Sequence, residues 1–137
     1  MILEGKIVDD PVTEKIIGCA FEVHNELGAG FLEKVYENSL RIRLVEAGFD
    51  VRQQFPIPVQ FHGQVVGEYF ADLLVNGSLL IEIKAVTQII KEHEIQLVNY
   101  LTATGFDVGL LINFGDSVTV KRKFRQRQTK INRPIIH

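Results

Sequence analysis

The stretch GEYFADLLVNGSLLIEIKA, residues 67–85, is typical of two apolar strands joined by an Asn-Gly turn. Three charged residues, Asp72, Glu82 and Lys84, stand inside these runs of leucine, isoleucine, valine and phenylalanine. Burying a charge is costly unless the charge is paired or binds a metal ion. The charged residues therefore indicate that this hairpin has a role beyond packing.

Whether the three charges meet depends on the length of the turn. Glu82 and Lys84 are two residues apart on a strand, so their side chains share a face. A two-residue Asn-Gly loop would turn Asp72 to the opposite face, because a slip of one residue reverses the orientation of every side chain. A three-residue loop at 75–77, with its glycine in the left-handed conformation, would pair Asp72 with Leu80 and place it diagonal to Glu82. We predict the three-residue loop, because the charges need an odd loop to lie together.

Two converging carboxylates form an oxygen site that suits Mg²⁺ or Mn²⁺. The ion would offset the repulsion that otherwise raises the pKa of one carboxyl group. A lysine beside it can orient water or stabilise charge on a phosphoryl oxygen. The hypothesis is that Asp72 and Glu82 bind a metal ion and Lys84 acts on the substrate. From these residues alone, a salt bridge between Lys84 and either carboxylate on a half-exposed face is an equal alternative.

The remaining pattern predicts one α/β domain with the element order ααβββαββ and a central mixed sheet flanked by helices. Asp10-Pro11 is typical of a helix start, and Gly48 and Gly105 are typical of helix ends. The prolines at 56 and 58 favour an edge strand or a bulge. For the third helix we expect a core side made of Ile95, Val98, Leu101 and Thr102. The predicted helices are 11–27, about 31–47 and about 91–104, and the predicted strands are about 51–61, 64–74, 79–85, 106–114 and 117–124.

The composition is that of an ordinary globular domain, since 46% of the 137 residues are hydrophobic and 23% are charged. No apolar run is long enough to span a bilayer, and the first ten residues lack the features of a signal peptide. The single cysteine, Cys19, fits a reducing compartment. We therefore expect a cytoplasmic protein with no membrane partner.

Basic residues gather near the end of the sequence. Residues 121–133 hold seven of the fifteen lysines and arginines and none of the seventeen acids. Such an arm can contact nucleic-acid phosphates, and a solvated edge strand with a tail is the alternative. We expect a domain over residues 1–125 and a basic tail over 126–137, with nucleic-acid contacts from Arg125, Arg127, Lys130 and Arg133.

Two further motifs lie on the predicted helices. GFLEKVYENSL contains Gly30, Glu33 and Tyr36 as G-x-x-E-x-x-Y, and HEIQLVNYLTATG contains Gln96 and Tyr100 as Q-x-x-x-Y. Spacings of three and four place each set on one helix face. For both tyrosines, core packing is the alternative to a functional role. With the phrases ADLLV, IEIKAV and GLLINF, the span of about 10–125 resembles the GxxExxY family of the PD-(D/E)XK nuclease superfamily.

The resemblance implies a restriction-endonuclease-like core with the carboxylates at the middle of the sheet. Asp72 and Glu82 would then be metal ligands, and Lys84 would act on the attacking water. Glu33 would reach the metal from the outer shell, and Gln96 would position a phosphate or Lys84. The proline in the superfamily's name is absent, because Ala71 precedes Asp72.

The expected function is therefore a Mg²⁺- or Mn²⁺-dependent nuclease that hydrolyses phosphodiester bonds in DNA, acting as a homodimer. The alternative is a non-catalytic module that keeps the nuclease fold and binds nucleic acid or protein.

Overall fold

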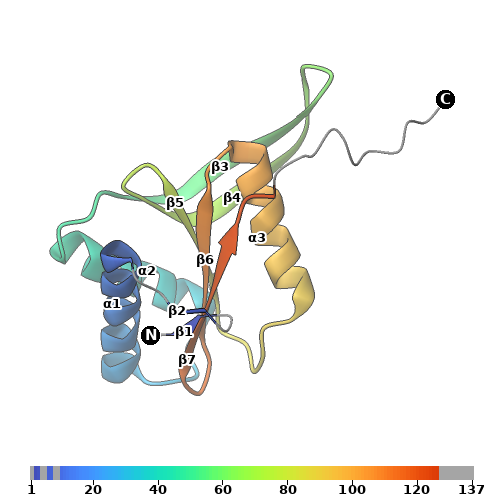
Figure 1. The fold of residues 1–137 in the computed structure, drawn as a ribbon. Helices are drawn as coiled ribbons and strands as arrows, with labels where there is room; N and C mark the ends of the chain where they lie inside the picture. Colours follow the sequence, from blue (N-terminus) through green and yellow to red (C-terminus); the bar gives the residue numbers. More distant parts are fainter. Residues whose placement is uncertain (1, 4–5, 8–9, 127–137) are drawn as a thin grey trace.

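The computed structural model describes residues 2–3, 6–7 and 10–126, and a five-stranded mixed sheet runs through its centre (Figure 1). Strands β5 and β6 are parallel, and the other neighbours in the order β3-β4-β5-β6-β7 are antiparallel. A parallel pair needs a crossover, which helix α3 supplies. The strands are β3 Val51–Phe61, β4 Gln64–Val75, β5 Leu79–Lys84, β6 Val108–Phe114 and β7 Val118–Phe124.

Helices cover both faces of this sheet (Figure 1). Helices α1 (Pro11–Leu27) and α2 (Glu33–Glu46) pack on one face, and α3 (Lys91–Thr104) packs on the other. Strand β6 is apolar without alternation because both of its faces are covered. The predicted fold class and element order are confirmed. A short antiparallel ribbon of β1 (Ile2–Leu3) and β2 (Lys6–Ile7) precedes them and was not predicted.

The helix ends follow the local signals in the sequence. The Asp10 side chain accepts hydrogen bonds from the Val12 N–H at 3.1 Å and from the Thr13 hydroxyl at 2.8 Å, so it caps α1 as expected. Helix α3 ends at Gly105, whose φ of 82° is left-handed. Helix α2 begins at Glu33, slightly later than predicted, after a Leu32 N-cap that provides no side-chain hydrogen bond.

The predicted core side of α3 is partly wrong. Leu101 is fully buried as expected, but Ile95 is 49% exposed and Thr102 is exposed. The sheet instead contacts the face that carries Leu97 and Tyr100. The spacing of apolar residues did not identify the buried face of α3, because Ile95 lines an open groove beside the helix and does not enter the core.

The loop between β4 and β5 has the predicted odd length but a shifted position. Val75 pairs with Leu79, so the loop is 76–78 rather than 75–77. Asn76 and Gly77 have φ values of 52° and 68°, which both residues tolerate. The Asn76 side chain accepts a hydrogen bond from the Asp50 N–H at 3.0 Å, and the Asn76 N–H donates to the Asp50 carbonyl at 2.8 Å. These two bonds hold the loop at its observed position.

This shift changes the partner of the first charged residue. Leu74 pairs with Leu80, so the predicted pairing of Asp72 with Leu80 is wrong. The pairing of β4 with β5 ends at Leu73 and Ile81, so the register does not determine the face of Asp72, and the shared face of Asp72, Glu82 and Lys84 stays a prediction.

The β3–β4 hairpin is longer than the rest of the sheet and projects past it (Figure 1). Strand β3 is an edge strand, as its prolines predicted, with an irregularity between Val59 and Gln60. The turn at His62-Gly63 has positive φ at both residues, 50° and 75°. Strand β5 pairs with β4 only between Leu73 and Val75 among the described residues, so the outer half of the hairpin pairs with itself.

Candidate active site

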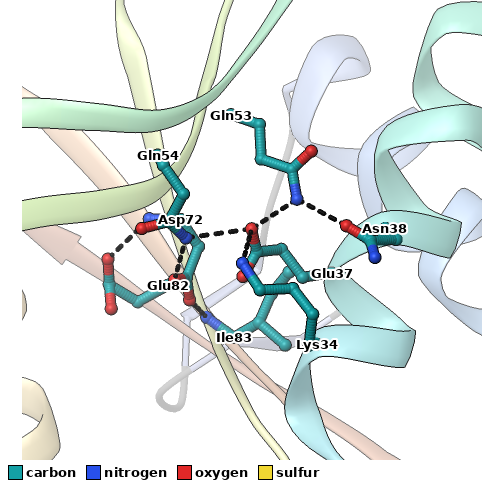
Figure 2. A network of polar contacts seen from close by, with 8 residues as sticks. All are labelled: Lys34, Glu37, Asn38, Gln53, Gln54, Asp72, Glu82 and Ile83. Carbon is teal, nitrogen blue, oxygen red and sulfur yellow. Dashed lines mark hydrogen bonds and ion pairs between the residues drawn. The ribbon is translucent and has the colours of Figure 1, made fainter.

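Strands β4 and β5 separate where the charged residues lie. Their backbone pairing stops at Leu73 and Ile81. Beyond that pair, Glu82 Oε1 accepts from the Asp72 N–H at 3.0 Å, and Asp72 Oδ2 accepts from the Ile83 N–H at 2.8 Å (Figure 2). Carboxylates therefore satisfy backbone N–H groups that the diverging strands leave without carbonyl partners. We call Asp72, Glu82 and Lys84 the fork cluster.

Burial controls the ionisation of both carboxyl groups. Glu82 is only 6% exposed. Burial, followed by repulsion from Asp72, raises the pKa of Glu82 to about 8. Burial also raises the pKa of Asp72, against the opposing effect of the Ile83 hydrogen bond. The pair thus holds a proton at neutral pH that isolated carboxylates would release.

Lys84 follows Glu82 on the same strand and is half-buried. Its charge lowers the pKa of Glu82, although burial and Asp72 outweigh it. Within the described part of the chain, the Lys84 amine forms no hydrogen bond or ion pair. The alternative of a salt bridge between Lys84 and either carboxylate is therefore not found, and no described residue prevents the amine from binding a ligand.

Tyr100 of α3 lies close enough to the same carboxylates for their charges to affect its phenol. Burial, then Glu82 and Asp72, raises the pKa of the Tyr100 phenol to about 12. Tyr100 is 7% exposed and belongs to the core, which agrees with the alternative that this tyrosine has a packing role. Its hydroxyl stays protonated at neutral pH and can donate a hydrogen bond toward the fork.

A polar network joins the fork to helix α2 (Figure 2). The Gln54 amide donates to Glu37 Oε2 at 2.9 Å and to Asp72 Oδ1 at 3.2 Å, so it bridges two carboxylates. Gln53 and Lys34 also donate to Glu37 Oε2. Burial would raise the pKa of Glu37, but the hydrogen bonds from Gln54, Gln53 and Lys34 together hold it below its usual value. Glu37 therefore stays ionised beside the fork cluster.

An unusual backbone conformation makes this network possible. Successive side chains of a strand point to opposite faces, yet Gln53 and Gln54 both reach Glu37. Gln54 has a φ of 54°, in the left-handed region that residues other than glycine rarely adopt. This turn in the backbone brings both amides to the α2 side. Such strain is found where a structure holds functional groups in place.

The residues of the G-x-x-E-x-x-Y motif have different surroundings. The Tyr36 hydroxyl donates to the Gly28 carbonyl at 2.6 Å and accepts from the Phe31 N–H at 3.2 Å. Tyr36 is buried and stacks on Phe114 at 4.7 Å, so it holds the loop before α2, as the packing alternative predicted. Gly30 has a φ of 103° in that loop.

Glu33 is exposed at the start of α2 and forms no side-chain hydrogen bond with the described residues. It lines a hollow with Ala85 and Val86, just after β5. After burial and Glu37, the charge of Glu33 contributes to the raised pKa of Asp72. The structure thus places Glu33 near the fork cluster but not in contact with it.

Gln96 is half-buried on α3, one turn before Tyr100, and lines the groove beside the helix. No hydrogen bond joins its side chain to a described residue. Its neighbour His93 accepts from the Ile90 N–H at 3.2 Å and so stabilises the helix start.

The predicted basic contacts lie mostly outside the described residues. Arg127, Lys130 and Arg133 belong to the range 127–137, which the structure does not describe. The Arg125 guanidinium donates to Asp107 Oδ1 at 2.9 Å, in an ion pair at the exposed end of β7.

Sequence reasoning missed Glu37, Gln53 and Gln54. Glu37 lies one helical turn after Glu33, a spacing that keeps both acids on one face. The adjacent glutamines interrupt the alternation of a strand that is otherwise rich in apolar residues. Both signals are present, but neither indicates that these residues meet Asp72.

The site therefore consists of two acidic residues where two strands of a mixed sheet diverge, followed by a lysine. The sequence pattern of the PD-(D/E)XK nuclease superfamily matches residues 10–127, and the chain belongs to that superfamily. No curated protein matches the chain. Within the part of the chain that is described, none of the helices has the length and apolar character to cross a membrane.

Two solved structures share the fold. An alkaline exonuclease from Laribacter hongkongensis, LHK-Exo, is similar with a TM-score of 0.52 and 18% identity, covering 88% of this chain and 73% of that chain. The crystal structure of SSO0001 is similar with a TM-score of 0.50 and 14% identity, covering 88% and 81%. At such low identity, the likeness concerns the fold alone.

Proposed function

We propose that this protein hydrolyses phosphodiester bonds in DNA with the help of Mg²⁺ or Mn²⁺. The observation that carries the proposal is the fork cluster. In it the buried Glu82 and the half-buried Asp72 each accept a backbone N–H of the other strand, and the Lys84 amine nearby has no partner among the described residues. Membership in the PD-(D/E)XK nuclease superfamily supports it. A structural salt bridge would have used the amine, which pairs with neither acid.

The fork cluster fits a divalent cation. Asp72 and Glu82 would hold the ion, since two buried carboxyls with raised pKa values are the arrangement that a cation stabilises. Among the described residues, no group of three or more His, Cys, Asp and Glu side chains could hold the ion alone. Water and a substrate phosphate would complete its coordination, as Mg²⁺ commonly allows. When bound, the cation would polarise the phosphate and lower the pKa of water.

The chain's own residues supply the remaining roles in this proposal. The Lys84 ammonium orients the attacking water and stabilises negative charge on the phosphoryl oxygens. Gln96 positions a phosphate or Lys84. Glu33 acts from the outer shell, and Glu37 holds Asp72 in place through the bridging Gln54 amide.

A cleavage panel tests this function. Single-stranded, double-stranded and branched DNA and RNA are incubated with wild type, Asp72→Asn and Lys84→Ala, with Mn²⁺ or with EDTA. Metal-dependent cleavage of DNA that both variants lose by at least about a hundredfold is expected, since each removes a group that acts on the reacting phosphate. If no substrate is cut by the purified wild type, the non-catalytic binding module replaces the nuclease.

We also propose a family within the superfamily, a cellular location, an oligomeric state and domain boundaries for the protein. The G-x-x-E-x-x-Y motif supports membership in the GxxExxY family, and the single cysteine supports a cytoplasmic location. We also propose a homodimer, which sedimentation of the purified protein would test. We assign residues 1–125 to the nuclease domain and 126–137 to a tail that contacts DNA phosphates. Changing Arg125, Arg127, Lys130 and Arg133 to serine should weaken duplex binding and reduce its salt dependence, by roughly 0.9 units of slope for each lost contact.

A further inference from the structure

A groove of about 1130 Å³ lies between helix α3 and the β3–β4 hairpin. Among the residues that the structure describes, its lining contains the acid Glu92 and no lysine or arginine. Four aromatic rings and three carboxamides line it, namely Phe55, Tyr69, Tyr100 and Phe106, and Gln60, Gln96 and Asn99.

The rings form two pairs along the groove. Tyr69 and Tyr100 have centroids 5.7 Å apart at 45°, and Phe55 and Phe106 have centroids 6.0 Å apart at 51°. In these tilted arrangements the rings do not stack face to face. Tyr69 is 47% exposed, so a planar ligand can reach its ring from solvent.

The carboxamides of the groove are uncommitted. The side chains of Gln60, Gln96 and Asn99 form no hydrogen bond with any described residue. Each offers both a donor and an acceptor, the pattern that reads the edges of nucleobases.

The groove lies close to the strand that carries Asp72. Tyr100 lines the groove and belongs to the same apolar cluster as Ala71, the residue before Asp72 on β4. A chain that lies in the groove therefore runs near the fork cluster.

We propose that this groove binds unpaired nucleobases of a single-stranded segment that leads into the fork cluster. The described lining of the groove offers no cation to phosphates, whereas aromatic rings stack on bases of any sequence. Paired bases within a duplex do not expose their faces, so the groove selects single strands or unpaired ends. This inference rests on the proposed function, because nucleic acid is taken to be the substrate.

Fluorescence anisotropy with a labelled oligodeoxythymidylate tests the proposal, in EDTA so that no cleavage occurs. Tyr69→Ala should weaken single-strand binding by roughly tenfold, since alanine substitution of a stacking ring costs about 1–3 kcal/mol per base. Tyr69→Trp should retain it. The matched control is Phe70→Ala, because Phe70 is the next residue on β4, is 52% exposed and lies outside the groove. The control should change binding by less than about twofold.

A second variant guards against misfolding. Asn99 is exposed, so Asn99→Asp should leave the melting temperature unchanged while its added charge weakens single-strand binding. Equal single-strand affinity for wild type, Tyr69→Ala and Asn99→Asp would overturn the inference, as would a wild type that prefers duplex. The cleavage panel tests the proposed function separately. If the wild type cuts no substrate but binds single strands in a Tyr69-dependent way, the proposed hydrolysis is refuted and the proposed base-binding groove is not.

Discussion

The two ends of the β4–β5 hairpin differ sharply although a few residues separate them. At the closed end, Leu73, Val75 and Ile81 are fully buried and the backbones pair. At the open end, pairing stops and the carboxylates of Asp72 and Glu82 accept the N–H groups instead. Burying each large apolar side chain contributes about 1.5–3 kcal/mol, whereas burying an acid is costly. Stability is therefore concentrated at the closed end, which supports an energetically unfavourable open end.

The largest effect is expected from breaking the closed end. Ile81→Ala should lower the free energy of unfolding by about 2–5 kcal/mol, because it removes buried methylene groups and leaves a cavity. Urea denaturation measures the loss. Lys84→Ala, on the same strand, is the matched control and should cost less than about 1 kcal/mol, because Lys84 is half-buried and its amine has no partner among the described residues. Similar losses for both variants would contradict the division between the two ends.

The ionisation of Glu82 provides the next test. Its pKa of about 8 lies above the ordinary 4.5, so between these values the folded chain keeps a proton that the unfolded chain releases. Stability of the metal-free protein should therefore fall as pH rises from 4.5 to 8. Glu82→Gln removes this dependence and should gain on the order of 3 kcal/mol relative to wild type between pH 5 and pH 9. Urea titrations at both pH values measure it, with exposed Glu46→Gln as the control. Parallel pH profiles for wild type and Glu82→Gln would refute the assignment.

Metal binding should reverse the instability of the open end. Mn²⁺ at about a hundredfold above its dissociation constant should stabilise the wild type by about 2.7 kcal/mol, because it binds the folded state alone. Asp72→Asn should lose most of that gain while keeping its fold. Thermal melting with and without Mn²⁺ measures both. An equal gain in the variant would mean that the ion binds elsewhere.

The smallest effect concerns the strained support of the fork. Gln54→Ala removes the amide that bridges Glu37 and Asp72 but keeps the left-handed φ, whereas Gln54→Gly removes the amide and relaxes the backbone. Gln54→Gly should therefore be more stable than Gln54→Ala by about 1 kcal/mol. Chemical denaturation of the pair measures this difference. Identical stabilities would show that the left-handed conformation carries no strain.

Local sequence signals determined most elements of this fold. Asp10 caps α1, Gly105 ends α3, and the continuous apolar run of β6 predicts a strand covered on both faces. These signals act within a few residues, so they can be read without the rest of the chain. The odd length of the β4–β5 loop could also be predicted, because the side chains of a strand alternate and the loop length sets the parity.

Only the tertiary structure decided the pairing register and the surroundings of the fork. The observed β4–β5 register differs from the predicted one by one pair, because Asn76 forms hydrogen bonds with Asp50. Asp50 lies before β3 and is far from Asn76 in the sequence. The exposed position of Ile95 depends on the hairpin beside α3, which periodicity within the helix does not describe. Glu37, Gln54 and Asp72 come from three separate elements, and their hydrogen bonds form only when α2 packs against the sheet. Long-range contacts of this kind leave no periodic pattern in the sequence, because their energy depends on which elements meet rather than on their neighbours along the chain.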